Sequence, residues 1–223
     1  MVSGVHKKVQ QMRVTYIVSA YNRPEMLRGC LSSLVVQTDR DLEVIVADNA
    51  TDFVIAQQNQ NIVEGLRDPR FRHRDTDSVK TCAGWCCYHS AEFVASNWAK
   101  GDWLCFPSDD SYYVPTFQQT MLCEAERKGW ELVYCDMLRN DDSIDGRKIT
   151  GAQGDYYFKW DVAPHVGGID KTGFLVRRDR FTGFPKKNTD VPGPCAADGE
   201  LVAALVKCGV RHGKAAGILV VHN

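Results

Sequence analysis

The chain has 223 residues and a mass of 25.0 kDa, which is enough for one full α/β domain. Its formal net charge is -1, so bulk electrostatics do not favour nucleic-acid binding, which would call for a clear basic excess. Apolar residues make up 44% of the chain, but no run of about 18 occurs, so the sequence predicts a sizeable core and no transmembrane helix.

The first predicted elements form a strand–helix–strand unit. Residues 14–20 (VTYIVSA) are an almost continuous apolar run, which is typical of a strand buried on both faces. Asn22 is a good N-cap residue and Pro24 a good first-turn residue for the following helix, whose apolar positions extend to Leu34. Residues 42–47 (LEVIVA) predict the next strand, so the unit implies a parallel pair joined by a right-handed crossover.

The later elements repeat this alternation less regularly. We predict helices at residues 52–66, 84–99, 115–128 and about 198–208. We predict strands at residues 71–74, 102–106, 131–136, 173–178 and 217–222. Residues 141–168 show no clear period and predict a long loop or a small irregular hairpin region. The simplest account is one compact α/β domain.

Cysteine usage and the start of the chain indicate the compartment. The number of cysteines is odd, and Cys105 and Cys135 lie inside apolar runs, as buried thiols in a reducing compartment do. Residues 1–13 lack the apolar region of a secretory signal. We therefore expect a cytoplasmic protein, with peripheral membrane association left open. The cluster CAGWCCYH at residues 82–89 leaves zinc binding as an alternative, although no second Cys/His pair stands at a recognised spacing.

Polar residues follow three of the predicted strands, at Tyr21-Asn22, Asp48-Asn49 and Ser108-Asp109-Asp110. Because open α/β sheets bind ligands at the carboxyl ends of their strands, we expect these residues to share one rim. The sequence contains no GxxxxGK[ST] loop, no GxGxxG after the first strand and no GxSxG elbow. A polyanionic ligand would therefore need its charge met by a divalent cation on carboxylates. By itself, the Asp109-Asp110 pair is weak evidence for such a site and fits a solvated turn better.

The chain contains, in order, VTYIVSAYNRPEMLRGCLSSLVVQT, LEVIVADNATD and GDWLCFPSDDSYYVPTF. This order resembles the GT-A core of the family 2 glycosyltransferases, and the likeness continues through GFLVRRDRFTGFP, AADGELVAALVKCG and ILVVHN. The resemblance implies a single GT-A, Rossmann-like domain over residues 1–223, with a mixed, mostly parallel sheet flanked by helices. Residues 13–110 would form its nucleotide-binding half and residues 111–223 its acceptor-binding half.

The implied activity is transfer of a sugar from a nucleotide-diphosphate sugar donor to an acceptor hydroxyl, with inversion. The acceptor would be a glycan, a lipid-linked saccharide or a small molecule, and the cofactor Mn²⁺ or Mg²⁺. The resemblance implies donor contacts by Ala20, Tyr21, Asn22, Arg23, Asp48 and Asp109. It implies metal ligation by Asp110 and His222, and Asp198 as the catalytic base, with Glu200 as the fallback. Trp160 and His165 are the candidates on the acceptor side, since aromatic faces stack on sugar rings.

Two positions depart from the family pattern. Ser108 replaces the first acidic residue of the D-x-D metal motif, and Ala197 replaces the first half of the acidic pair before the base. Asp198 also fits a helix N-cap, and Trp160 and His165 also fit packing under a long loop.

The family's common Ala-Arg-Asn pattern is missing before residue 101; Lys80 or His89 are alternatives for meeting phosphate, although a solvated surface role fits both better. Rival functions are a degenerate GT-A domain that binds a nucleotide sugar or a partner without catalysis, and a sugar nucleotidyltransferase. The nucleotidyltransferase is disfavoured because no glycine-rich loop follows the first strand.

Overall fold

The computed structural model describes residues 14–76, 86–140, 158–185 and 197–223. The strands are β1 (Val14–Ala20), β2 (Leu42–Asp48), β3 (Phe71–Asp75), β4 (Trp103–Cys105), β5 (Ser111–Tyr113), β6 (Leu132–Arg139), β7 (Phe158–Trp160), β8 (Phe174–Arg177) and β9 (His212–His222). The helices are α1 (Pro24–Val35), α2 (Phe53–Gly65), α3 (Cys86–Trp98), α4 (Phe117–Lys128) and α5 (Ala197–Lys207). Short 3₁₀ turns lie at Lys171–Gly173 and Arg178–Arg180.

These strands form one mixed sheet in the order β3-β2-β1-β4-β8-β6-β9-β5, and β7 pairs with β6. The neighbours from β3 to β4 are parallel, and β9 runs parallel to β6. β8 is antiparallel to both β4 and β6, and β5 is antiparallel to β9. The predicted fold class, a mixed α/β sheet flanked by helices, is confirmed.

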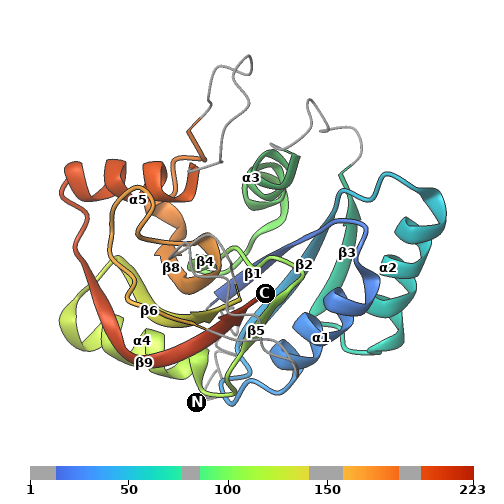
Figure 1. The fold of residues 1–223 in the computed structure, drawn as a ribbon, viewed down its shortest axis with the longest axis horizontal. Coiled ribbons are helices and arrows are strands. Elements are labelled where there is room, and N and C mark those ends of the chain that lie inside the picture. Colours follow the sequence, from blue (N-terminus) through green and yellow to red (C-terminus); the bar gives the residue numbers. More distant parts are fainter. Residues whose placement is uncertain (1–13, 77–85, 141–157, 186–196) are drawn as a thin grey trace, which may run out of the picture.

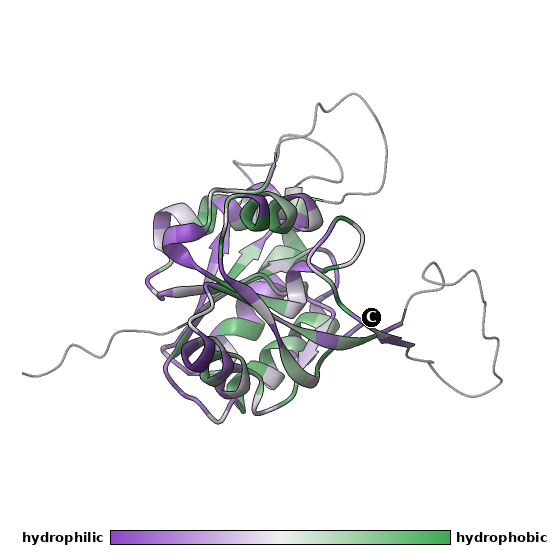
Figure 2. Cartoon of the chain, turned by 90° about the vertical axis from the view of Figure 1, so that its left-hand side faces the viewer, coloured by the Kyte–Doolittle hydropathy of each residue, from purple (hydrophilic) through white to green (hydrophobic). Residues whose placement is uncertain are grey.

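Helices cover the sheet from both sides. In Figure 1, α3 and α5 lie above the sheet, whereas α1, α2 and α4 lie on the other side. Every residue of β1 and β2 is buried, which is the expected outcome for strands packed between two helical layers. The helices carry both hydrophilic and hydrophobic residues (Figure 2), as amphipathic helices on a core do. Within the described residues, no helix is long and apolar enough to cross a membrane.

The starts of two helices differ from the prediction. Asn22 does not cap α1: Arg23 takes that position without a side-chain cap bond, and Asn22 has a positive φ of 32°. Helix α4 begins at Phe117 and not at Pro115, and it ends as predicted before Gly129, whose φ of 67° favours glycine. Helix α2 has a true cap, because the Asp52 carboxylate accepts two backbone N–H bonds from its first turn.

Two strands differ from the prediction: β9 is longer than expected, and β5 was not predicted. The last strand already begins at His212, since its early residues pair with β6. The short strand β5 was not predicted, and it is defined by its pairing with β9. The buried thiols expected at Cys105 and Cys135 are confirmed, whereas the side chains of Cys82, Cys86 and Cys87, and with them the zinc alternative, lie outside the described residues.

Candidate active site

The loop after β4 places two carboxylates beside the end of β1. Ser19 and Ser108 form a parallel bridge, and the Asp109 backbone N–H donates to the Ser19 carbonyl at 3.1 Å. The carboxylate of Asp109 accepts the backbone N–H of Tyr21 at 2.9 Å. Asp109 is 1% exposed and Asp110 4% exposed, so a solvated turn is excluded at this position.

Arg23 neutralises this acidic pair. One of its guanidinium nitrogens pairs with Asp109 Oδ1, and the other donates to Asp110 Oδ2 at 2.5 Å. Burial raises the pKa of Asp109 to about 6, although the N–H of Tyr21 and the charge of Arg23 oppose this rise. A cation between two adjacent buried carboxylates removes most of their mutual repulsion.

Replacing Arg23 by alanine is expected to lower the free energy of unfolding by about 1.5–3 kcal/mol, because charge-assisted hydrogen bonds to buried carboxylates are lost. Urea unfolding of the metal-free protein measures this change. Arg28→Ala, inside the helix that Arg23 precedes, is the matched control, because its exposed pair with Glu25 should contribute less than about 1 kcal/mol. Equal effects of the two substitutions would contradict the neutralising role of Arg23.

The pairing of β5 with β9 brings His222 to the same place, opposite Ser111. His222 Nδ1 lies 3.1 Å from Ser111 Oγ and 3.4 Å from Asp110 Oδ1. On its other side, His222 Nε2 lies 4.0 Å from Asp170 Oδ2. The imidazole therefore stands between two carboxylates from different parts of the chain.

The Asp110 and His222 side chains fit a divalent cation. Asp110 Oδ1 is buried, faces His222 and has no hydrogen-bond partner among the described residues. An imidazole and a carboxylate together suit Mn²⁺. The described residues contain no group of three or more His, Cys, Asp and Glu side chains that would hold a metal ion. The remaining ligands would then come from water and a bound phosphate, as is usual for Mg²⁺-type sites at phosphates.

Asp198 lies in the first turn of α5 and its carboxylate is fixed by two backbone groups. Oδ1 accepts the N–H of Gly199 at 2.9 Å, and Oδ2 accepts the N–H of Lys171 at 3.0 Å. Burial, together with the nearby charge of Asp170, raises the pKa of Asp198 to about 6. A buried carboxylate with a pKa this close to neutrality is suited to accept a proton. Because α5 already includes Ala197, the N-cap alternative for Asp198 is wrong.

Glycine at position 199 is a packing requirement. A Cβ at Gly199 would lie 2.7 Å from Val166 Cα and 3.2 Å from the carbonyl oxygen of His165. The start of α5 therefore packs directly on the backbone of residues 165–167, and the predicted acceptor residue His165 lies next to the helix turn that carries Asp198.

Sequence reasoning missed Asp170 and Lys171, which precede β8. Asp170 Oδ1 accepts the N–H of Thr172 at 2.9 Å, and Oδ2 lies 3.5 Å from Arg139 Nη1. Burial would raise the pKa of Asp170, but the nearby imidazole of His222, the N–H of Thr172 and the charges of Arg139 and Lys171 outweigh burial and hold it below its usual value. Lys171 is buried, and its backbone supports Asp198 as described above. The segment GIDKTG offers no periodic or motif signal that would single these residues out.

Comparisons with known proteins agree with this architecture. Residues 15–84 match the family model described as "Glycosyl transferase family 2". A crystal structure of TarS from S. aureus aligns over 95% of this chain and 60% of its own, with a TM-score of 0.67 and 17% identity. The mannosyltransferase PcManGT from Pyrobaculum calidifontis, in complex with GDP-Man and Mn²⁺, aligns over 94% of this chain and 56% of its own, with a TM-score of 0.68 and 19% identity.

The chain has the GT-A fold of the family 2 glycosyltransferases. TarS in complex with UDP-GlcNAc also matches, with a TM-score of 0.64 and 16% identity over 94% of this chain and 58% of TarS. This GT-A chain thus spans between 56% and 60% of the length of these three structures.

The other predicted donor residues of this GT-A fold line the same rim. Ala20 is the buried last residue of β1, and the side chain of Tyr21 is exposed. Asn22 exchanges two hydrogen bonds with Thr51, at 2.9 and 3.1 Å, and so ties the start of α1 to the loop after β2. The expectation that the ends of β1, β2 and β4 meet is confirmed, since the Asn49 N–H also donates to the Ala20 carbonyl.

Asp48 at the end of β2 is buried, and each of its oxygens has protein partners. Oδ1 accepts the N–H of Ala50 at 2.9 Å and the amide of Asn59 at 3.1 Å. Oδ2 lies 2.9 Å from His73 Nε2. Contact between Asp48 and a nucleotide base stays a prediction, and these partners fix the orientation that the carboxylate would present.

The two acceptor-side candidates, Trp160 and His165, have different surroundings. Trp160 ends β7, and the Arg139 guanidinium lies over its ring at 4.8 Å, which links Trp160 to Asp170. His165 is exposed, and its Nδ1 lies 2.9 Å from the carbonyl of Val166. Of the phosphate alternatives, Lys80 lies outside the described residues, and His89 is half-buried on α3. Glu200 follows Asp198 in the first turn of α5 and is half-buried.

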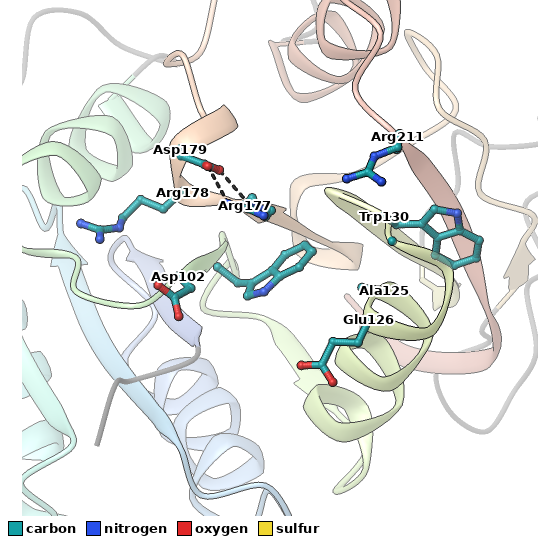
Figure 3. A pocket seen from close by; sticks show the side chains of 10 residues that line it. Asp102, Ala125, Glu126, Trp130, Arg177, Arg178, Asp179 and Arg211 are labelled. Atoms are coloured by element: carbon teal, nitrogen blue, oxygen red, sulfur yellow. Dashed lines mark hydrogen bonds and ion pairs between the residues drawn. The ribbon is translucent and has the colours of Figure 1, made fainter. Parts of the chain in front are cut away.

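A hollow of about 510 Å³ lies at the opposite end of the strands, and Figure 3 shows its side chains. Asp102 and Trp103 at the start of β4 line it, so it is remote from the carboxyl end of that strand. Its arginines already have partners: Arg177 pairs with Asp179, Arg211 with Glu131, and Arg178 with the carbonyl of Ala99. This hollow does not belong to the candidate active site.

Proposed function

We propose that the protein transfers a sugar from a nucleoside-diphosphate sugar to an acceptor hydroxyl, with inversion at the anomeric carbon. The observation that supports this proposal is that two sets of polar side chains, Asp110 with His222 and Asp170 with Asp198, meet at one edge of a GT-A sheet. The pair Asp110–His222 faces the segment of Asp170 and Lys171, which in turn holds the buried carboxylate of Asp198. A cation-binding pair beside a base with a near-neutral pKa is what glycosyl transfer from a diphosphate needs.

In the proposed mechanism, Asp110 and His222 would hold Mn²⁺ or Mg²⁺, which would supply positive charge to neutralise the diphosphate leaving group. Asp198 accepts the proton of the acceptor hydroxyl while that oxygen attacks the anomeric carbon from the face opposite the diphosphate. The backbone N–H groups of Gly199 and Lys171 keep the carboxylate of Asp198 in one orientation. Asp109, held by Arg23 and the Tyr21 N–H, faces the donor, and Asp48 faces its base.

The donor class is supported by the ligands named for the similar structures. TarS is described in complex with UDP and with UDP-GlcNAc, and PcManGT with GDP-Man and Mn²⁺. For this chain we propose a nucleotide-diphosphate sugar without choosing the base or the sugar. The acceptor is a glycan, a lipid-linked saccharide or a small molecule bound on the side of Trp160 and His165. A cytoplasmic location, with peripheral membrane association for a lipid-linked acceptor, belongs to the same proposal.

Thermal unfolding with UDP, GDP, UDP-GlcNAc and GDP-Man, each with and without Mn²⁺, tests the proposal. Because a ligand that binds only the native state stabilises it by mass action, a donor at about 100 times its Kd should add about 2.7 kcal/mol. We expect at least one diphosphate to raise the Tm, and to do so more with Mn²⁺.

Assay of donor turnover in the same samples separates the rival functions. Transfer or slow hydrolysis of the donor is expected from the proposed enzyme, whereas a binding-only GT-A domain shows neither. Failure of all four ligands to shift the Tm in the presence of Mn²⁺ would count against this donor class.

A further inference from the structure

We propose that Lys171 is a second cationic group of the donor site and binds the donor's diphosphate through its ammonium. This inference rests on the proposed function, and it assigns a role to a residue that the sequence did not single out. Its basis is a buried ammonium that forms no ion pair within 4.0 Å with a carboxylate in the described part of the protein.

The side chain of Lys171 is only 5% exposed, although it ends in an ammonium. Its Nζ donates to Ser19 Oγ at 3.2 Å and lies 5.7 Å from the centre of the Tyr88 ring. No ion pair joins this ammonium to a carboxylate of the described residues within 4.0 Å. A lysine ammonium has three N–H donors, so the Ser19 hydroxyl leaves donors without an acceptor.

A buried ammonium without an ion pair lowers the stability of the folded protein. Lysine is almost never fully buried unless it is paired, because desolvation of the charge is not recovered. Lys214 shows the usual arrangement in the same fold, since its ammonium contacts Asp136 at 2.8 Å and also pairs with Asp161. An anionic ligand would supply to Lys171 what Asp136 supplies to Lys214.

The position of Lys171 points to the diphosphate as that anion. Ser19, its hydroxyl partner, accepts the backbone N–H of Asp109 through its carbonyl. The backbone N–H of Lys171 itself donates to Asp198. The ammonium thus lies between the donor-side carboxylates and the base, where the bond from sugar to diphosphate would break. Arg23 already neutralises Asp109 and Asp110, so these carboxylates do not need the charge of Lys171.

The test compares the wild type with Lys171→Met, which keeps the length of the side chain but removes the charge. We expect the Kd for UDP or GDP in the presence of Mn²⁺, measured by calorimetry, to rise at least tenfold, as for loss of a hydrogen bond to a charged group. We also expect the Tm of the ligand-free variant to rise, because a buried ammonium without a close ion pair is gone. Inorganic pyrophosphate should raise the Tm of the wild type more than that of the variant.

Lys214→Met is the matched control, and it should leave the Kd of UDP or GDP unchanged while not raising the Tm, since a paired charge is removed. Lys171→Gln, which keeps a donor for Ser19, should reproduce the loss of diphosphate affinity if the methionine variant folds poorly. Unchanged affinity in Lys171→Met or Lys171→Gln would overturn the assignment of Lys171 alone. Absence of any UDP, GDP or pyrophosphate binding by the wild type with Mn²⁺ would instead overturn the proposed function, and this assignment with it.

Discussion

Replacing Asp198 by asparagine is expected to lower the rate of sugar transfer by about 10²–10⁴-fold, the usual contribution of a general base. Asparagine has nearly the same shape, but it cannot accept the proton of the acceptor hydroxyl. Initial rates at saturating donor measure the loss, and calorimetry with UDP or GDP should show donor affinity within a few-fold of the wild type. Full transfer rate in this variant would remove Asp198 from the mechanism.

The pH profile gives the same prediction a second readout. Burial and Asp170 raise the pKa of Asp198 to about 6, so its carboxylate is ionised above that pH and protonated below it. A base works only in its ionised form, so kcat/KM of the wild type should fall as the pH drops through about 6. This limb should be missing from the residual activity of Asp198→Asn.

Glu200→Gln is the matched control, two positions further along α5. Glu200 was the fallback base, but it lies two positions beyond Asp198 on the helix and therefore points away from it. We therefore expect Glu200→Gln to keep a rate within a few-fold of the wild type. A large loss there with none at Asp198 would transfer the role of base to Glu200.

Replacing Asp110 by asparagine is expected to raise the Kd of the donor in Mn²⁺ by about 10²-fold, which corresponds to about 3 kcal/mol. Its Oδ1 is the buried oxygen without a hydrogen-bond partner that faces His222, so it is the atom best placed to bind a cation. Calorimetric titration with Mn²⁺ alone, and with UDP or GDP in the presence and absence of Mn²⁺, measures the change.

Asp179→Asn serves as the control for this experiment, because Asp179 is an exposed carboxylate at the opposite end of the strands and pairs with Arg177. Both variants remove one negative charge, so they alter the net charge equally. Only Asp110→Asn should lose the effect of Mn²⁺ on donor affinity. Equal Mn²⁺ dependence in the wild type and Asp110→Asn would place the cation elsewhere.

Strands that are buried on both faces were the most predictable part of the fold. The run at residues 14–20 matches β1, and the run at residues 42–47 falls one residue short of β2. Such runs are predictable because a short, uninterrupted apolar sequence is typical of a strand buried on both faces of a sheet. β5 and the early part of β9 carry no such pattern. They are strands because they pair with each other and with β6, and local sequence does not contain that information.

Some residues of the candidate site could be predicted from the sequence, and others could be found only from the fold. Asp110, His222 and Asp198 stand at ends of predicted elements, and motif order marked them before the structure placed the first two in contact. Lys171 and the pairing of Arg23 with two carboxylates depend on contacts across many residues of sequence. A lysine inside GIDKTG looks like any surface lysine until the fold shows that it is buried.

The place of β8 between β4 and β6 has a consequence for biosynthesis. β4 pairs with β1 early in the chain, but its other edge stays uncovered until residues 174–177 have been made. During synthesis on the ribosome, an apolar strand edge is therefore open to pairing with other chains for the time that the intervening residues take to emerge. The non-local closure also predicts slow folding for a domain of this size. Chaperone demand should thus be highest when β6 is complete and β8 is still absent.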